Sequence, residues 1–326
     1  MTDLRILSTA PLRGDGLHRL QALGELVVDP WIDHSPLRLY NSEQLAERAR
    51  DEGADVVICE ADSCKGPLFE LPLLAIGSTR GDPTNVDLVG ATAAGIPVLR
   101  APGRNADGVA ELAVALAFAA TRGIVAADRD VRDGQVYRDG SIPYQRFRGW
   151  QLAGRTVGIV GYGAVGRAAA WRFGGLGMRV ISSDPFAADS THELDDLLAE
   201  ADLVSLHAAV TPDTVGLISA ERIARMKPGA VYVNTARAVL HDLDALTAAL
   251  ETGHLSAAGL DHFEGEHLPT DHPLAGMASV VLTPHIGGAT YDTEANHSML
   301  MATGLEALIR GDVPSNLANP EALHRG

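Results

Sequence analysis

The regular alternation of short β-like runs with helix-like segments constrains the fold more than any other feature of this chain. Strands joined by helices pair in parallel, because each crossover helix returns the chain to the same edge of the sheet. The runs that we predict as strands are 4–8, 55–59, 73–77, 97–99, 156–160, 179–182, 202–206, 230–234, 257–260 and 280–283. The sequence therefore predicts an α/β protein, and the last six runs match the strand count of a dinucleotide-binding sheet.

The length of 326 residues suits two domains better than one. We predict helices over 42–52 with Ser42 as N-cap, over 85–94 with Gly95 as its stop, over 105–121 and over 292–310. The segment 123–150 is polar and is expected to form the end of a helix followed by an extended arm.

Composition and charge exclude several classes of protein. The net charge of −16 argues against nucleic acid as a partner, because phosphate binding needs a basic surface. No apolar run reaches membrane-spanning length without a charged or glycine break. The first residues, Met1-Thr2-Asp3-Leu4-Arg5, lack the basic and apolar regions of a signal peptide. Cys59 and Cys64 are expected to be reduced thiols of a cytoplasmic protein, with a disulfide as the alternative.

A glycine fingerprint follows the strand predicted over 156–160. Its residues are Gly161-Tyr162-Gly163-Ala164-Val165-Gly166, and a predicted helix begins directly after it. In such a motif the glycines permit a tight turn, a close approach of the backbone to a pyrophosphate and close packing of helix on strand. Asp184, which ends the next strand and precedes Pro185, can accept hydrogen bonds from ribose hydroxyls and would repel a 2′-phosphate. The sequence therefore predicts NAD as the cofactor, in preference to NADP.

Two reactive side chains follow later strands. Arg237 comes just after the strand over 230–234, and a guanidinium can hold a carboxylate through two parallel hydrogen bonds. His285 follows the strand over 280–283, and an imidazole can exchange a proton with an alcohol or carbonyl oxygen near neutral pH. Taken singly, each has an ordinary alternative: Arg237 as a surface arginine and His285 as a loop histidine with satisfied hydrogen bonds.

Together these segments resemble the D-isomer-specific 2-hydroxyacid dehydrogenase family. The resemblance covers nearly the whole chain, and it is strongest over 97–111 and 152–290. Its motifs, in order, are the fingerprint 161–166, the run 233–237, Asp261-His262-Phe263 with the following Glu266, and the run 283–288. The resemblance implies two doubly wound parallel-sheet domains, in which a Rossmann NAD-binding domain (103–290) is inserted into a flavodoxin-like substrate-binding domain (1–102 and 291–326).

The resemblance also implies an enzyme that transfers a hydride between NAD and a small 2-oxo or D-2-hydroxy acid. In this reading Arg237 binds the substrate carboxylate and polarises the oxo group. His285 serves as general acid in reduction and general base in oxidation, while Glu266 hydrogen-bonds His285, orients its ring and favours its charged form. Asn105 is implied to lie near the substrate. Besides the fingerprint, the residues implied to contact the cofactor are Asp184, Pro185, His207, Thr235, Ala236 and Asp261.

The substrate is left open among small acids. The substrate loop departs from the usual family pattern at Arg80, which precedes Gly81. We expect Arg80 and Gly81 to contact the substrate, with Arg80 meeting an extra anionic or polyhydroxyl group; the alternative is a solvated loop arginine. Glyoxylate, hydroxypyruvate or a sugar-derived acid is therefore expected.

Two alternative functions remain. One is D-3-phosphoglycerate dehydrogenase, which we disfavour because Glu60 and Asp62 would repel a phosphate and because the sequence ends at Gly326, without the C-terminal regulatory domain of some such enzymes. The other is an NAD-sensing binding protein that resembles the transcriptional corepressors of this fold. We expect no metal, because no established ligand spacing joins the polar residues of one candidate loop, which are His262, Glu264, His267, Asp271 and His272.

The helix predicted over 105–121 also bears on assembly. From 109 to 120 it carries only one charge, Glu111, so it is apolar nearly all round. In the family that the chain resembles, this helix and the following arm form a two-fold interface. We therefore expect a homodimer through 105–121 and 123–150.

Overall fold

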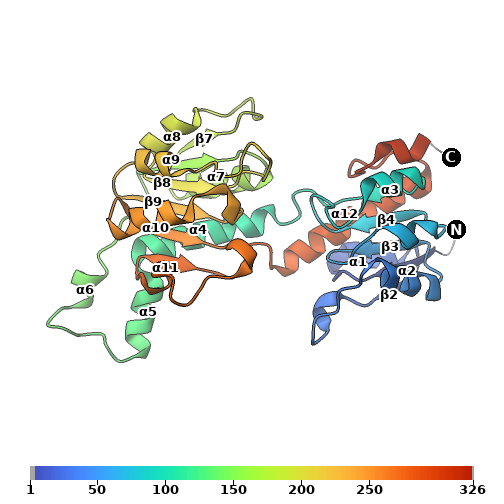
Figure 1. Cartoon of the computed structure of the whole chain (residues 1–326), viewed down its shortest axis with the longest axis horizontal. Helices are drawn as coiled ribbons and strands as arrows, with labels where there is room; N and C mark the ends of the chain where they lie inside the picture. The colour runs from blue at the N-terminus through green and yellow to red at the C-terminus, as the bar shows by residue number, and fades with distance from the viewer. Residues whose placement is uncertain (1–3, 325–326) are drawn as a thin grey trace. The chain divides into compact units, whose positions relative to one another are not determined.

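The computed structural model describes residues 4–324 and contains two compact units (Figure 1). Unit 1 comprises Met1–Arg104 and Thr290–Gly326, and unit 2 comprises Asn105–Ala289. The first three residues of the segment compared with a signal peptide, Met1-Thr2-Asp3, lie outside the described residues.

Unit 1 is built on a five-stranded sheet in which every pairing is parallel. The strand order is β2-β1-β3-β4-β5, which is the flavodoxin-like order. The strands are β1 (Leu4–Ser8), β2 (Gly24–Val28), β3 (Val56–Cys59), β4 (Ala75–Ser78) and β5 (Val98–Leu99).

Helices cover both faces of this sheet because successive side chains of a buried strand point to opposite sides. In β1, Ile6 packs into a cluster with α1 and α12, whereas Leu7 packs into a cluster with α2 and α3. The helices of unit 1 are α1 (Gly14–Gln21), η1 (Trp31–Asp33), α2 (Ser42–Asp51), η2 (Gly66–Glu70), α3 (Leu88–Ala93), α12 (Tyr291–Arg310) and η5 (Pro320–His324).

Two predicted helix starts in unit 1 are wrong by one to three residues. The N-cap of α2 is Asn41, not Ser42, because the Asn41 side chain accepts a hydrogen bond of 2.9 Å from the Gln44 N–H. The predicted helix 85–94 begins only at Leu88, where the Asp87 side chain caps the backbone of Gly90. In both cases the residue whose side-chain oxygen reaches the free N–H groups determines where the helix begins.

Unit 2 contains a six-stranded parallel sheet in the order β11-β10-β9-β8-β6-β7. The predicted fold class, two parallel-sheet α/β domains of Rossmann type, is confirmed. The order changes direction between β6 and β8, and ligands of open α/β sheets bind outside the carboxyl ends of the strands at such a point. The strands are β6 (Thr156–Val160), β7 (Arg179–Ser183), β8 (Leu203–Leu206), β9 (Ala230–Asn234), β10 (Leu255–Leu260) and β11 (Val280–Leu282).

Two groups of helices enclose the sheet of unit 2. Helices α4 (Ala106–Arg122) and α7 (Ala164–Gly175) pack with one face of the sheet, and α8 (Leu194–Glu200), α9 (Ala220–Arg225) and α10 (Leu243–Glu251) pack with the other. The shorter helices are η3 (Ala238–Leu240), η4 (Glu264–Glu266) and α11 (Pro273–Gly276).

Helix α4 buries one side against the sheet. Ala113, Leu116 and Ala117 are almost fully buried there, whereas Ala115 on another side is exposed. No single helix among the described residues is long and apolar enough to cross a membrane; α4 and the next helix together reach that length and composition, but they meet at a bend of 64°.

The arm after α4 contains more helix than the polar sequence predicted. It forms α5 (Ile124–Arg132) and α6 (Pro143–Arg146), which extend away from the sheet of unit 2 in Figure 1. Asp130, only 6% exposed, anchors the arm through ion pairs with Arg138 and Arg146. Buried carboxylates are stable only when paired, so these contacts shape a segment that lacks an apolar core of its own.

Candidate active site

The glycine fingerprint forms the turn between β6 and α7. Gly161 has φ +89°, and a Cβ there would lie 2.5 Å from the backbone nitrogen of Ala208. A Cβ on Gly166 would lie 2.0 Å from the carbonyl oxygen of Gly161. A Cβ on Gly163, in contrast, would meet no described atom within 4 Å. Two of the glycines therefore serve the packing of the turn, while the third leaves open space beside the N-terminus of α7, where backbone N–H groups attract anions.

Asp184, directly after β7, is held against this turn. Its carboxylate accepts hydrogen bonds from the backbone N–H of Tyr162 at 2.7 Å and from that of Phe186 at 2.9 Å. Pro185 beside it is exposed, as are Gly163 and Ala164 of the fingerprint, while Val165 is half-buried. The acidic residue and the glycine turn thus belong to one rigid structure.

The glycines allow a matched pair of substitutions. Gly166→Ala should destabilise unit 2 by roughly 1–3 kcal/mol, because the new methyl group overlaps a backbone oxygen. Gly163→Ala should leave the melting temperature unchanged but weaken NAD binding by about 5- to 150-fold, because its methyl group occupies the space of the pyrophosphate. Thermal unfolding and fluorescence titration with NADH measure the two effects. Unchanged NADH affinity in Gly163→Ala would contradict this assignment of the open space.

Two predicted cofactor residues follow β8 and β9. His207 makes a hydrogen bond of 2.8 Å with Ser205 through Nε2, and its Nδ1 lies 3.5 Å from the Thr235 hydroxyl. Burial lowers the pKa of His207 to about 4, so its ring is neutral at physiological pH. His207 and Thr235 thus form one polar cluster at the carboxyl edge of the sheet.

The segment that carries Arg237 is fixed by Asn234, a residue that was not predicted to have a role. Asn234 is 1% exposed; its side chain accepts from the Ala236 N–H at 2.8 Å and donates to the Arg237 carbonyl at 3.0 Å. The Arg237 side chain itself is exposed, and one of its nitrogens donates to the Ala236 carbonyl at 2.8 Å. An asparagine at the last position of a buried strand is the signal that could have pointed to this role.

Glu266 and His285, 19 residues apart in sequence, meet in space. The Nδ1 of His285 lies 2.8 Å from the Glu266 carboxylate. Both residues have φ +56°, a left-handed conformation that is uncommon for residues other than glycine. Such strained positions persist only where the surrounding structure enforces them, and they concentrate at functional sites.

Asp261 holds the loop that carries His285. It is 1% exposed and accepts hydrogen bonds from the Thr283 hydroxyl at 2.6 Å, the Ile286 N–H at 2.9 Å and the Gly287 N–H at 2.8 Å. This anchoring of the histidine loop was not predicted from sequence, because the partners lie 22 to 26 residues further along the chain.

The charges around Glu266 favour its ionised form. Burial alone raises the pKa of the Glu266 carboxyl, but the hydrogen bond to His285 and the nearby His285, His262 and Arg237 outweigh burial, and the pKa lies below its usual value. Arg237 also acts on His262 electrostatically, so the structure brings Arg237, Glu266 and His285 into one neighbourhood of unit 2. Asn105, at the start of α4, lies beside the turn after His285, because a Cβ on Gly288 would be 3.0 Å from its side-chain nitrogen.

Arg80 and Gly81 belong to unit 1, just after β4. The Nε of Arg80 donates to the Glu60 carbonyl at 2.7 Å, and a second nitrogen donates to the Thr84 hydroxyl at 3.0 Å. Two of the three guanidinium nitrogens of Arg80 are therefore hydrogen-bonded within unit 1.

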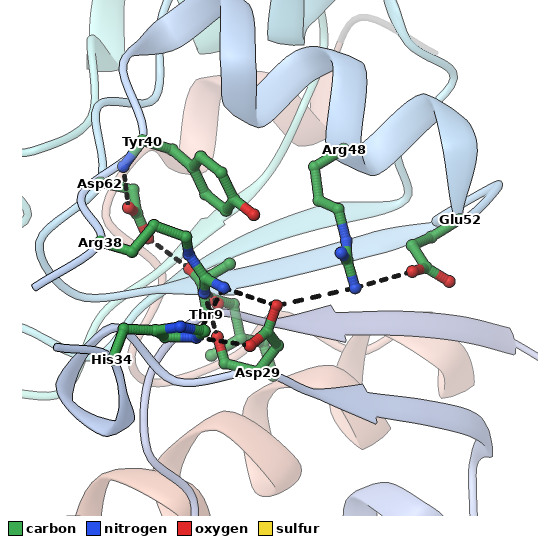
Figure 2. A network of polar contacts seen from close by, with 9 residues as sticks. Thr9, Asp29, His34, Arg38, Tyr40, Arg48, Glu52 and Asp62 are labelled. Carbon is green, nitrogen blue, oxygen red and sulfur yellow. Dashed lines mark hydrogen bonds and ion pairs between the residues drawn. The ribbon is translucent and has the colours of Figure 1, made fainter. Parts of the chain in front are cut away.

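The two acidic residues invoked against a phosphate are both engaged within unit 1. Asp62 is fully buried and accepts hydrogen bonds from the Thr9 hydroxyl and, at 2.6 Å, from the Tyr40 N–H (Figure 2). The same view shows Asp29 in a neighbouring group of ion pairs with His34, Arg38 and Arg48.

Glu60 forms an ion pair with Arg104, which offsets its charge, and it accepts a hydrogen bond of 3.3 Å from Trp31. Glu60 is thus paired with a cation, and Asp62 points into the core, where its partners are a hydroxyl and a backbone N–H.

One group of three side chains in the described part of the chain has potential metal ligands close together. Ligand atoms of His262, Glu266 and His285 all lie within 4.8 Å of one another. This group does not include the other possible metal ligands of the same loop, which are Glu264, His267, Asp271 and His272.

A Rossmann-type sheet with a glycine turn, an acidic residue after β7 and a histidine–carboxylate pair near an arginine defines a dinucleotide-dependent oxidoreductase. Residues 114–287 match the family described as the D-isomer specific 2-hydroxyacid dehydrogenase, NAD binding domain. The chain belongs to the D-isomer-specific 2-hydroxyacid dehydrogenase family, as the motifs predicted; it is an NAD-dependent D-2-hydroxyacid dehydrogenase, and NAD is its cofactor.

Individual relatives agree with this assignment. A glyoxylate reductase of Korarchaeum cryptofilum is 36% identical over 331 residues, which cover 98% of this chain and 97% of the relative. A D-3-phosphoglycerate dehydrogenase of Mycobacterium tuberculosis is 39% identical over 307 residues, covering 91% of this chain but only 56% of that protein. Among solved structures, the TT0316 protein of Thermus thermophilus is 34% identical with a TM-score of 0.80, covering 97% of this chain and 100% of the other.

Proposed function

We propose that this enzyme interconverts a small 2-oxo acid and its D-2-hydroxy acid, with glyoxylate, hydroxypyruvate or a sugar-derived acid as substrate. The observation that carries the proposal is the His285–Glu266 contact of 2.8 Å with Arg237 acting on the same carboxylate. A proton donor beside a permanent cation is what reduction of a 2-oxo acid needs, because negative charge develops on the oxo oxygen and the substrate carries a carboxylate.

The residues around the fingerprint fit the cofactor. The open space at Gly163 and the N-terminus of α7 would hold the pyrophosphate, and the Asp184 carboxylate would accept from the ribose hydroxyls. His207, Thr235, Ala236 and Asp261 would line the path toward the nicotinamide. When bound, NAD supplies or accepts the hydride.

Side chains of this protein would bind the substrate and transfer the proton. Arg237 would bind the substrate carboxylate and polarise the oxo group, with Asn105 near the substrate. His285 would deliver a proton from Nε2 to the oxo oxygen in reduction and remove it in oxidation. Glu266 would hold the His285 ring through Nδ1 and stabilise its charged form.

Unit 1 is the proposed substrate-binding domain. Arg80 is held by the Glu60 carbonyl and the Thr84 hydroxyl, which leaves its third nitrogen available for an anionic or polyhydroxyl group of the substrate. The glyoxylate reductase relative supports a small substrate. Phosphohydroxypyruvate, the oxo acid of the phosphoglycerate reaction, is the second candidate, because Asp62 is buried and Glu60 is paired with Arg104.

We also propose a homodimer formed through α4, α5 and α6. Apolar side chains with no cover in the single chain gather there: Ile124 is 51% exposed, Val131 65% and Tyr144 78%. Phe118 and Val131 line a hollow of about 540 Å³ in the same region. Exposed apolar patches of this kind mark interaction sites. Sedimentation equilibrium should then report twice the chain mass of 34.3 kDa.

We also propose a cytoplasmic location, because Cys59 and Cys64 are free thiols rather than a disulfide; cell fractionation tests it.

The test of the function is NADH oxidation, followed at about 340 nm, with a panel of 2-oxo acids: glyoxylate, hydroxypyruvate, pyruvate, branched and sugar-derived acids, and phosphohydroxypyruvate. We expect the highest kcat/KM for glyoxylate, hydroxypyruvate or a sugar-derived acid. A preference for phosphohydroxypyruvate would transfer the assignment to the second candidate. Tight NADH binding without turnover of any acid would favour the NAD-sensing, corepressor-like alternative.

A further inference from the structure

His262 is a second imidazole at the pair of Glu266 and His285, and no role has been assigned to it above. Its side chain is only 14% exposed. Its Nε2 lies 3.3 Å from the same Glu266 oxygen that contacts His285 Nδ1 at 2.8 Å. Its ring packs edge-on against the His285 ring, with centroids 4.6 Å apart and an interplanar angle of 63°. One side chain therefore touches both members of the pair.

The tautomer of His262 follows from its other ring nitrogen. The backbone N–H of Ala238 donates to His262 Nδ1 at 3.2 Å, so Nδ1 carries a lone pair and, in the neutral ring, Nε2 carries the hydrogen. The nitrogen that lies 3.3 Å from Glu266 therefore carries the hydrogen, and it acts on the carboxylate electrostatically. Since Ala238 directly follows Arg237, His262 also links the backbone of the arginine segment to the acid–base pair.

This tautomer argues against a metal at the three side chains. Two histidines and a glutamate are a ligand set of zinc enzymes, but a ligating nitrogen must present a lone pair to the ion. Turning the lone pair of His262 toward Glu266 would place a hydrogen on Nδ1 against the Ala238 N–H. The close approach of the three side chains therefore needs a different explanation.

We propose that His262 is a positioning residue: its Nε2–H, 3.3 Å from Glu266 Oε1, attracts the carboxylate and keeps it turned toward His285. Glu266 needs such support, because its side chain is 58% exposed. An unrestrained exposed carboxylate samples several rotamers, and each rotamer away from His285 leaves the imidazole without its partner. The inference rests on the proposed acid–base role of the pair.

The charge state of His262 suits this role. Burial lowers the pKa of His262, Glu266 raises it, and the charges of His285 and Arg237 lower it again, so it lies below the usual value. Asp261 is the remaining charged group that acts on it. The lowered pKa of His262 thus favours its neutral form, in which Nε2 carries the hydrogen.

A pair of substitutions separates the N–H from the ring. His262→Gln keeps a side-chain N–H of similar reach, whereas His262→Phe keeps an aromatic ring and removes the N–H. Loss of the N–H beside the carboxylate raises the pKa of Glu266, so Glu266 becomes protonated at a higher pH. For His262→Phe we expect the acid limb of kcat/KM to move up by about 0.5–1 pH unit and kcat to fall about 2- to 10-fold, while His262→Gln stays near wild type.

The ¹³C titration of the Glu266 carboxyl in protein without substrate provides a readout that does not depend on turnover. The proposal predicts an upward shift of the same size in His262→Phe and none in His262→Gln. An unshifted titration in His262→Phe, or equal shifts in both variants, would overturn it. If Phe prevents folding, His262→Leu replaces it. Should the wild type turn over no 2-oxo acid, the proposed function fails, while the carboxyl titration still decides the role of His262.

Discussion

His285→Ala should lower kcat for reduction of the preferred 2-oxo acid by about 10²–10⁴-fold, the usual contribution of a general acid–base group. The imidazole is 2.8 Å from Glu266 through Nδ1, which leaves Nε2 to exchange the proton with the substrate oxygen. Alanine removes the proton donor and leaves the glycine turn and Asp184 untouched. NADH affinity should therefore change little, and single-turnover kinetics should locate the defect in the chemical step.

His18→Ala is the matched control for this loss. His18 is an exposed histidine of α1, so its removal should leave kcat and NADH binding at wild-type values. If His285→Ala keeps more than about a tenth of the wild-type kcat, the general-acid role would have to be abandoned, because even the low end of this effect is about 10². A fall in NADH affinity without a fall in kcat would instead assign His285 to cofactor binding.

Arg237→Ala should reduce kcat/KM for the same acid by about 10²–10³-fold or more, the cost of removing one preorganised group that stabilises charge in a transition state. We expect kcat to fall and KM to rise, because the guanidinium is proposed to bind the carboxylate in the ground state and to polarise the oxo group in the transition state. Arg237→Lys should have a lower KM than Arg237→Ala, because lysine keeps the positive charge. Its KM should stay above that of the wild type, because lysine cannot form the two parallel hydrogen bonds of a guanidinium. Steady-state kinetics with both variants measure the two contributions.

Chemical rescue makes this second prediction specific. Added guanidinium at millimolar concentration should restore part of the activity of Arg237→Ala and none of that of His285→Ala. Arg50→Ala, which removes an exposed arginine of α2, should behave as wild type. Wild-type kcat/KM in Arg237→Ala would mean that another cation binds the substrate carboxylate.

Local patterns predicted much of the fold. Alternation of strand and helix runs, with a glycine fingerprint after one strand, was sufficient for two parallel-sheet domains and for NAD as cofactor. Errors occurred where the local signal was weak. Neither α1 nor β2 was predicted. Helix α1 begins after Arg13, which provides no side-chain cap, and β2 is half exposed at the edge of its sheet. The polar arm was expected to be extended, because its helices depend on ion pairs of Asp130 rather than on an apolar stripe.

The candidate site, like the fold, could be predicted from sequence only in part. Arg237, Glu266 and His285 could be named from sequence because each follows a strand in a parallel sheet, and the carboxyl ends of such strands share one edge. The sequence could not predict which way a buried carboxylate points. Asp62 was expected to repel a phosphate, and its side chain turns into the core toward Thr9 and Tyr40. Its neighbour Glu60 is paired with Arg104, 44 residues further along the chain.

The sequence by itself determined the fold class, the family and the cofactor, and it predicted which side chains are reactive, because short-range periodicity and motif spacing carry that information. Only the tertiary structure decided which charges are neutralised and which side chains support the reactive ones. Asp261 anchors the loop of His285, Asn234 anchors the segment of Arg237, and His262 lies against the pair of Glu266 and His285. The physical reason is that these contacts depend on rotamers and on distances between segments far apart in sequence, which are set when the loops pack together and are not encoded in any local pattern.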